Sequence, residues 1–389
     1  MGAYFDHNAT TPLDPRVLEA MLPWLAERFG NTSSAHRWGQ AAREAVEAAR
    51  ESVAKLVGAA SPLEVVFTAS GTEANNTVIL EALVRSAGTG HFVVSGLEHP
   101  SIANALAAPI AARARVTRVA AEPSGVVDPE RMIAALAPDT ALVALMLASN
   151  EIGTLQPVAE VARAARARGI PMLCDAVQAA GKIPVDAGAL DVDYLTVGAH
   201  KFSGPLGAAA LWVRPGAPFA PMLLGGSQER RRRASTPNVA ALVGFGVAAG
   251  LAGRELPERA RRLAALRDRF EAGVSRLLPG AQVHGAAAPR LPHTSSVAFP
   301  GVVNQELMIR LDLEGWAVSI GAACASGQIE PSAALTAMGV PRAVALGTLR
   351  LSFGMTNREE EIDAFLPALA RAVADLRPAP AAPPEALPW

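Results

Sequence analysis

The sequence predicts an α/β fold in which helices cover both faces of a mostly parallel sheet. From residue 64 onward, short β-branched runs alternate with helical segments, which is typical of parallel sheets. The chain has 389 residues and half are apolar, enough for two or three domains with a large core. From about residue 256, a long amphipathic helix and shorter strands follow, which predicts a second, smaller α+β domain.

The first 60 residues predict two polar loops and two helices. Residues 6–12 are polar and turn-like, and an apolar-periodic segment follows from Val17 to Leu25. Residues 31–36 form a second polar loop. The next segment has apolar residues at helical spacing, namely Ala42, Val46, Ala49, Val53 and Leu56.

Six strands are expected in the large domain. Asp128 before Pro129, and Gln156 before Pro157, mark helix starts between them. The apolar stretch from Val239 to Gly253 is shorter than the ~20 residues that cross a membrane, so we expect a buried helix. The strand ranges are 64–68, 91–95, 115–119, 141–148, 171–174 and 194–197.

The small domain is expected to follow. Its strands are placed at 294–299, 316–320 and 348–353, after an amphipathic helix at 263–277. Thr356 and Glu359 match a capping box that opens a last helix through Leu376. We place the large domain at residues 13–255 and the small domain at 1–12 and 256–376. The Pro- and Ala-rich tail, 377–389, is expected to be disordered.

Charge and cysteine content restrict the function. A formal net charge of −1 argues against wholesale attraction to nucleic acid or to a membrane surface. The N-terminus has no export or myristoylation signal, and Cys174 and Cys324 do not form a disulfide framework, so we expect a cytoplasmic protein with free thiols. The run Arg230–Arg233 is interpreted as a solvated loop, with an acidic partner or a phosphate as the alternative.

Two polar residues at the ends of neighbouring strands suggest a bound cofactor. Asp175 follows the strand at 171–174, and Lys201 lies just past the strand at 194–197. In such sheets ligands bind outside the carboxyl ends of the strands. A lysine amine can form a Schiff base with an aldehyde, and a carboxylate can hold a protonated pyridine nitrogen, as pyridoxal phosphate requires. A structural ion pair is the alternative.

Other polar residues are expected at the same edge. Gly71 and Thr72 lie between a strand and a helix, where free amides could bind a phosphate or simply form a turn. His99 could stack on a ring and move protons, or could be a structural loop histidine. Gln178 could donate to a ring hydroxyl and Asn150 could contact the ring or a substrate carboxylate, but either amide could instead hold its own loop.

Cys324 and Arg350 are further candidates. Cys174 belongs to an apolar run and is expected to be buried, whereas Cys324 lies in a Gly- and Ala-rich loop from which a thiolate could attack a substrate. The alternative is that Cys324 is a loop cysteine without a catalytic role. Arg350 lies inside an apolar strand, so its guanidinium needs a carboxylate, supplied by an amino-acid substrate or by an internal salt bridge.

With these residues assembled, the chain resembles the cysteine desulfurases, a family within the class V aminotransferases and the fold-type I pyridoxal-phosphate enzymes. The resemblance extends from residues 6–12 to residues 350–353. The most specific motifs are Ser149–Gly153, Asp175–Gln178, Ala199–Lys201, and Cys324 followed by residues 330–332.

The resemblance implies a pyridoxal 5′-phosphate cofactor and a role for each residue at the sheet edge. Lys201 would carry the Schiff base and move the α-proton, Asp175 would pair with the pyridine nitrogen, and His99 would cover the ring. Gly71, Thr72 and His200 would hold the phosphate. Thr236 would reach across a homodimer interface to the partner's cofactor.

The resemblance also implies the reaction. Asn150 and Arg350 would bind the carboxylate of L-cysteine. Cys324 would attack the substrate sulfur, leaving L-alanine and a persulfide for a protein acceptor. An iron–sulfur scaffold, a thiolating enzyme for tRNA or cofactors, and a biosynthetic pathway remain open as the destination of the sulfur. We expect no metal and no direct nucleic-acid partner.

Three places depart from the family pattern. Gly198 stands where the family usually has serine, which removes one phosphate hydrogen bond. Arg233–Thr236 reads Arg-Ala-Ser-Thr in place of Arg-Ser-Gly-Thr, and Ser319–Cys324 also differs. Two alternatives stay open: another class V enzyme, such as a selenocysteine lyase, an epimerase or an aminotransferase, and an inactive scaffold for a sulfur-transfer partner.

Overall fold

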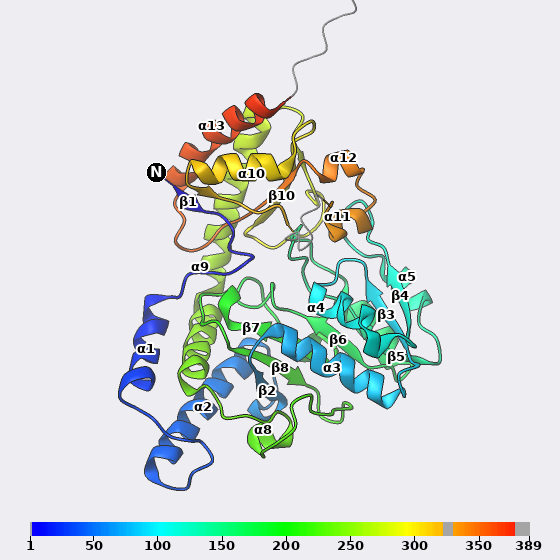
Figure 1. Cartoon of the computed structure of the whole chain (residues 1–389), viewed down its shortest axis with the longest axis vertical. Coiled ribbons are helices and arrows are strands. Elements are labelled where there is room, and N and C mark those ends of the chain that lie inside the picture. The colour runs from blue at the N-terminus through cyan, green and yellow to red at the C-terminus, as the bar shows by residue number, and fades with distance from the viewer. Residues whose placement is uncertain (1, 322–329, 378–389) are drawn as a thin grey trace, which may run out of the picture.

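The computed structural model of the chain describes residues 2–321 and 330–377. Cys324 and the tail from residue 378, both subjects of predictions above, lie outside the described residues. Figure 1 shows a large lower part built around a sheet and a smaller upper part, with the long helix α9 (Val239–Leu277) running through both.

The described residues form a central seven-stranded sheet in the order β2-β8-β7-β6-β5-β3-β4. β8 runs antiparallel to β2 and β7, and the other neighbours are parallel. This confirms the predicted fold class and all six predicted strands. The strand predicted at 141–148, β5, is shorter than expected, and β8 was not predicted. The bounds are β2 Val65–Thr68, β3 His91–Ser95, β4 Arg115–Val119, β5 Thr140–Ala144, β6 Met172–Asp175, β7 Tyr194–Gly198 and β8 Ala209–Val213.

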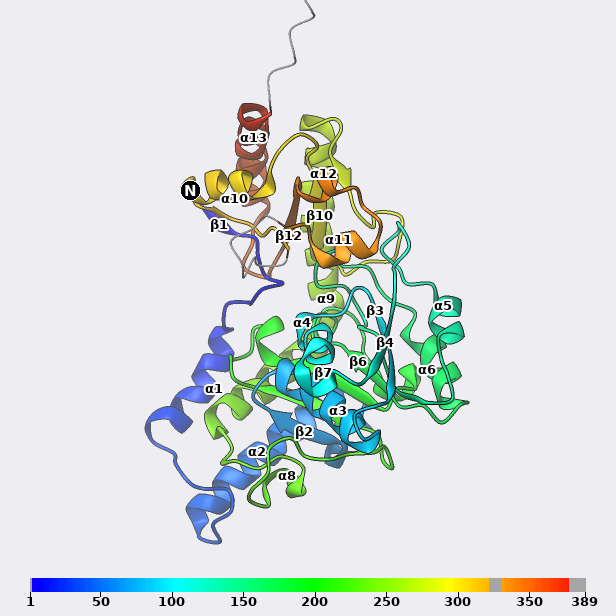
Figure 2. The same cartoon turned by 45° about the vertical axis from the view of Figure 1, so that its right-hand side comes forward.

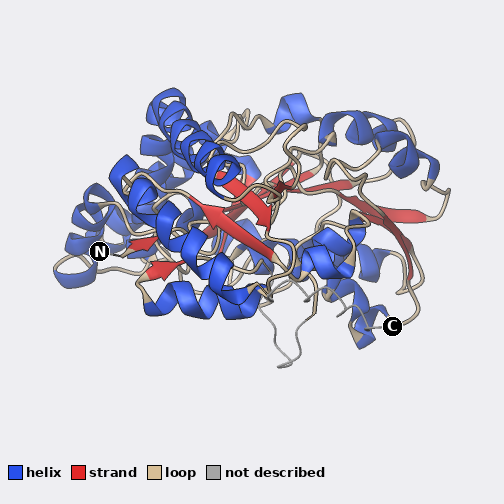
Figure 3. Ribbon diagram, turned by 90° about the horizontal axis from the view of Figure 1, so that it is seen from above, coloured by secondary structure: helices blue, strands red, loops and turns tan. Residues whose placement is uncertain are grey.

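Helices cover both faces of this sheet, as Figure 3 shows from above. On one face, Ile79 and Leu83 of α3 (Gly71–Arg85) pack with Phe92 and Leu173. On the other, α2 (Arg37–Leu56), α6 (Val158–Arg166) and the first half of α9 bury their apolar sides. The other helices here are α1 Pro15–Ala26, α4 Pro100–Ala103, α5 Pro129–Ala134, α7 Ala187–Leu190 and α8 Gln228–Arg231.

The helix α9 corrects one prediction. The sequence suggested a buried helix ending near Gly253 and a separate amphipathic helix, but the two are one helix of 39 residues that continues through Pro257. Its length and apolar composition would allow it to cross a membrane, yet 56% of its apolar window is buried inside the protein. It packs along α1, α2 and α13, as the core helix of a globular protein does.

The smaller part has its own core, which includes Phe5, Phe270 and Phe353. β10 (Thr294–Ala298) pairs antiparallel with β12 (Thr348–Ser352) and β9 (Gln282–Val283). The N-terminal strand β1 (Ala3–Tyr4) pairs with β11 (Trp316–Ala317), so the N-terminus joins this part. The remaining helices are α10 Asn304–Leu313, α11 Ala333–Ala337, α12 Arg342–Ala345 and α13 Glu359–Leu376.

Two details of this part differ from expectation. Leu335 belongs to the core of the large sheet, and Ala121 donates a backbone hydrogen bond to Ala337 (3.1 Å), so α11 lies over the ends of β3 and β4 (Figure 2). The last helix is capped at Arg358 rather than Thr356, because the Glu361 carboxylate accepts the Arg358 N–H (3.1 Å). The exact domain division stays a prediction.

Candidate active site

Lys201 is held at the end of β7 by the N-terminal loop. It closes a short 3₁₀ turn, Ala199–Lys201, directly after the strand. Its Nζ donates to the carbonyl oxygens of Asn8 (2.6 Å) and Ala9 (2.7 Å). Burial, and then the nearby Arg350 guanidinium, lower the pKa of Lys201 to about 8. A substantial fraction of neutral amine is therefore present near physiological pH.

Asp175 and His99 are joined by a chain of hydrogen bonds through residues that the sequence did not single out. Asn75 Nδ2 donates to Asp175 Oδ2 (2.8 Å) and to Ser101 Oγ (2.9 Å). Ser101 Oγ lies 2.9 Å from His99 Nδ1, and the Ser101 backbone N–H donates to the same nitrogen (3.1 Å). Nδ1 is thus an acceptor, so a neutral His99 carries its proton on Nε2.

Asn8 connects several of the predicted residues. Its carbonyl oxygen accepts from Gln178 Nε2 (2.9 Å) as well as from Lys201, and its Nδ2 donates to the Asn150 carbonyl (3.0 Å). Lys182 Nζ in turn contacts the carbonyl and side-chain oxygens of Gln178, each at 3.2 Å. Gln178 is therefore fixed from both sides, and Asn8 brings Lys201, Gln178 and Asn150 into one cluster.

Gly71 and Thr72 open helix α3 at the same edge. Ser70 Oγ caps the helix by accepting the Glu73 N–H (3.1 Å), and no described residue accepts a hydrogen bond from the Gly71 or Thr72 N–H. A Cβ on Gly71 would lie 3.0 Å from a methyl group of Val177, so glycine lets the turn approach the segment after β6 closely. The two amides are available to an anion at the positive end of the helix.

His200 and Gly198 lie beside this turn. Burial, then the charges of Lys201 and Lys182, lower the pKa of His200 to about 4, so its imidazole is neutral at physiological pH. Its Nδ1 lies 3.1 Å from Thr10 Oγ1. A Cβ on Gly198 would meet Val177 at 3.6 Å and His200 at 3.7 Å, ordinary contact distances. The turn therefore has room for a side chain that this sequence lacks.

Arg350 is buried in β12 and faces the loop that contains Asn150. Its Nη2 pairs with Asp6 Oδ1 (2.7 Å) and donates to Ser319 Oγ (3.1 Å), while Nη1 donates to the Asn150 carbonyl (3.0 Å). The alternative of an internal salt bridge is therefore realised. The buried Nε still has no partner among the described residues, and neither does the Asn150 side-chain amide, so donors remain for a carboxylate.

Thr236 is the predicted residue that lies apart from this cluster in a single chain. It is exposed, on a loop that Arg233 ties to Glu73 in the first turn of α3 (2.8 Å). Arg233 is largely buried, so the expectation of a solvated Arg230–Arg233 loop was wrong at this residue. Its side chain forms an ion pair with the Glu73 carboxylate instead of extending into solvent. Ser235, where the family usually has glycine, has a φ of +108°.

The arrangement fits pyridoxal phosphate. A lysine with a lowered pKa, a buried carboxylate fixed by an amide, and open amides at a helix N-terminus converge on the carboxyl ends of β6 and β7. Buried beside them, Thr196 Oγ1 has no partner in the described residues. The fold and this donor set define the class: a fold-type I pyridoxal-phosphate enzyme.

The comparisons with known proteins specify the family. The aminotransferase class-V family model matches residues 3–365. A cysteine desulfurase of Enterobacter agglomerans is 40% identical, covering 97% of this chain and 94% of that protein. The cysteine desulfurase NifS of Azotobacter vinelandii is 39% identical, covering 96% and 93%. A solved structure titled NifS-like protein is 36% identical with a TM-score of 0.89, covering 97% and 100%.

The chain thus belongs to the class-V aminotransferase family, whose members depend on pyridoxal phosphate. The predicted family resemblance and cofactor are confirmed. The individual roles of the site residues stay predictions. Sequence reasoning missed Asn8, Asn75 and Lys182. Asn8 lies in the polar segment 6–12 that was noted without a function, and this was the available signal.

Proposed function

We propose that this protein is a cysteine desulfurase that converts L-cysteine to L-alanine and carries the sulfur as a persulfide on Cys324. The observation that carries the proposal is the Lys201–Asp175–His99 arrangement, in a chain similar over almost its whole length to proteins named cysteine desulfurase.

The cofactor would be held at both ends. Asp175 would pair with the pyridine nitrogen, and Asn75 and the Val177 N–H (3.0 Å) keep that carboxylate oriented. Gly71, Thr72 and neutral His200 would hold the phosphate, with His99 over the ring and Gln178 at the ring hydroxyl. When bound, pyridoxal phosphate supplies an electron sink that weakens bonds to the substrate α-carbon.

Lys201 is the proposed proton carrier. With its pKa near 8, Nζ can give up and recover a proton at neutral pH, as a general acid–base group must. Between proton transfers, the carbonyl oxygens of Asn8 and Ala9 would hold Nζ in place by accepting its hydrogen bonds.

The substrate carboxylate would bind between Arg350 and Asn150. The unpartnered Nε of Arg350 and the free Asn150 amide supply donors, and the pairing with Asp6 fixes the guanidinium before the substrate arrives. A guanidinium that is already oriented loses little conformational freedom on binding.

Cys324 would take the sulfur. Its thiolate attacks the substrate sulfur, an S–S bond forms as the C–S bond breaks, and the electron pair stays with the carbon, which becomes the methyl group of alanine after protonation. The persulfide then passes to a protein acceptor. We further propose a cytoplasmic homodimer in which the partner's copy of the exposed Thr236 loop completes the phosphate site.

Replacing each cysteine in turn tests this reaction. Cys174 on β6 is fully buried, and burial raises its thiol pKa well above the ordinary value, so it is a matched control that cannot act as a nucleophile. Sulfide release from L-cysteine should collapse in Cys324→Ala and persist in Cys174→Ala, with the visible band of the bound cofactor present in both. Full activity of Cys324→Ala would point to a selenocysteine lyase or another class V reaction.

A further inference from the structure

A cavity lies beside Lys201, and neither Asp175 nor His99 lines it. It is lined by residues of the N-terminal loop, of α9, of the chain just before β10 and of the chain just after β12. Of the residues described in the active site, Lys201 and Lys182 line it. About 40 Å³ of it is open to the centres of water-sized spheres. This is room for a few waters or one small ion.

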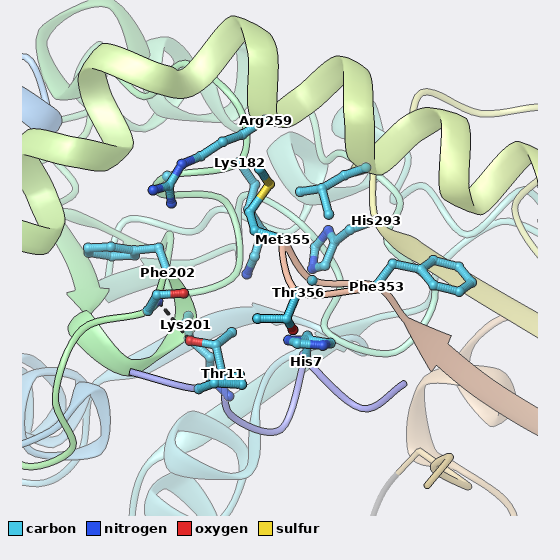
Figure 4. Close-up of a pocket in the computed structure, with 15 residues that line it drawn as sticks. His7, Thr11, Lys182, Lys201, Phe202, Arg259, His293, Phe353, Met355 and Thr356 are labelled. Atoms are coloured by element: carbon cyan, nitrogen blue, oxygen red, sulfur yellow. Dashed lines mark hydrogen bonds between the residues drawn. The ribbon is translucent and has the colours of Figure 1, made fainter. Parts of the chain in front are cut away.

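Three basic side chains that line this cavity each keep a polar group without a hydrogen-bond partner among the described residues. His7 and His293 are almost fully buried, and neither ring nitrogen of either residue has a hydrogen-bond partner among the described residues. Lys182 is also buried and uses its ammonium on two oxygens of Gln178, which leaves one N–H. Figure 4 shows Lys182, His7 and His293 around the same space beneath α9.

The charges around the cavity are unbalanced. Neither aspartate nor glutamate is among the described residues that line it. The carboxylates around the cavity have other partners. Glu255 and Asp14 pair with Arg259 (2.6 and 3.8 Å), and Glu361, whose charge acts on His7, accepts a hydrogen bond from Asn357 Nδ2 (3.1 Å). Burial, and then the charges of Lys182 and His7, lower the pKa of His293, so the three groups lie close enough to repel one another when charged. Burial, and then the charge of Lys201, lower the pKa of Lys182 well below its ordinary value, because a buried ammonium without a counter-charge is costly.

We propose that this cavity binds a small monovalent inorganic anion of the size of chloride. The anion accepts hydrogen bonds from Lys182 Nζ and from the ring N–H groups of His7 and His293. A water molecule could satisfy the ring nitrogens, but only an anion would stabilise the charged form of Lys182. Because Lys201 lines the same cavity, the charge of the anion also favours the protonated form of that amine. This inference does not depend on the proposed sulfur chemistry.

Bromide is the probe for a direct test. Crystals of the holoenzyme grown in sodium bromide, measured at the bromine absorption edge, should show an anomalous peak within hydrogen-bond distance of Lys182 Nζ and a ring nitrogen. The same crystals of Lys182→Met should lack it, whereas Lys55→Met, the same change at an exposed position on α2, should keep it. Density in the wild-type cavity without an anomalous signal would mean water and would overturn the proposal.

A solution measurement covers the case in which Lys182→Met does not fold. The Tm of the wild-type holoenzyme should be roughly 1–2 °C higher in bromide, at about ten times its Kd, than in gluconate of equal ionic strength, because gluconate is too large for the cavity. His293→Leu should remove that difference and Lys55→Met should keep it. Equal Tm values in the two salts for the wild type would also overturn the proposal.

Discussion

Replacing Gly198 with serine should tighten cofactor binding. The position has φ −130°, which any residue adopts, and an added Cβ would lie 3.6 Å or more from its neighbours, so serine fits without displacing Val177 or His200. The hydroxyl would lie at the end of β7 beside the amides of Gly71 and Thr72. A hydrogen bond to a charged group is worth about 1.5–3 kcal/mol, so the Kd for pyridoxal phosphate should fall roughly 10- to 100-fold.

Gly198→Ala separates the hydroxyl from the added Cβ. Both variants lose the flexibility of glycine in the unfolded chain, so both should be stabilised to a similar extent before cofactor is added. The assay is titration of the cofactor-free protein with pyridoxal phosphate, followed by the visible band. Binding by Gly198→Ser no tighter than by Gly198→Ala would refute the placement of the phosphate at this turn.

Three further changes have definite signs. Asn75→Ala should lower the free energy of unfolding by about 1.5–3 kcal/mol, because it removes a hydrogen bond to the buried Asp175 carboxylate. Asn76→Ala, which loses hydrogen bonds to neutral carbonyl groups, should lower it by only about 1 kcal/mol. Equal losses for the two variants in urea unfolding would contradict this prediction. Ser235→Gly should stabilise the protein by about 1 kcal/mol, because glycine adopts the φ of +108° without backbone strain. Ser227→Gly, at a φ of −84°, should give no such gain. A loss of stability in Ser235→Gly would count against strain at this residue. Burial, and then Lys182, lower the pKa of His7 to about 4 from 6.5. The unfolded chain therefore binds the extra proton between these values, and stability present above pH 6.5 is lost as the pH falls toward 4. For the cofactor-free protein His7 contributes up to about 3 kcal/mol of this loss, so His7→Asn should flatten the curve of unfolding free energy against pH; an unchanged slope would exclude His7 as a source.

The strands that lead into the site could be predicted because their signal is local. The runs at 171–174 and 194–197 are short, apolar and followed at once by Asp175 and by Ala199–Lys201, so strand ends and polar residues mark each other. β8 escaped prediction because Ala209 and Ala210 have little β-propensity. Its place in the sheet is decided by antiparallel pairing with β2 and β7.

The supporting residues could not be predicted because their partners are distant in the chain. Asn75 is one of two adjacent asparagines on α3, and only the folded chain shows that it meets Asp175 while Asn76 does not. Asn8 likewise gains its role from Gln178 and Lys201. The helix α9 continues through Pro257 because both its halves are held by buried cores, a tertiary effect that overrides local propensity.

Arg350 shows that two alternatives can both hold. A single guanidinium has five donors, so the ion pair with Asp6 does not exclude a substrate carboxylate. Asp6 belongs to the N-terminal loop, as does Asn8, and this loop therefore contacts both Arg350 and Lys201. A resemblance by motif points to Arg350 and Lys201 separately, whereas the structure shows that one short segment positions both.

The most direct test of the proposed reaction is to locate the sulfur after a single turnover. The holoenzyme is mixed with one equivalent of L-cysteine without a reductant, and alanine and the masses of the cysteine-containing peptides are measured in the same sample. We expect one added sulfur atom on the peptide that contains Cys324 and an equal amount of alanine. Alanine without sulfur on Cys324, or sulfur on the Cys174 peptide instead, would contradict the proposed function.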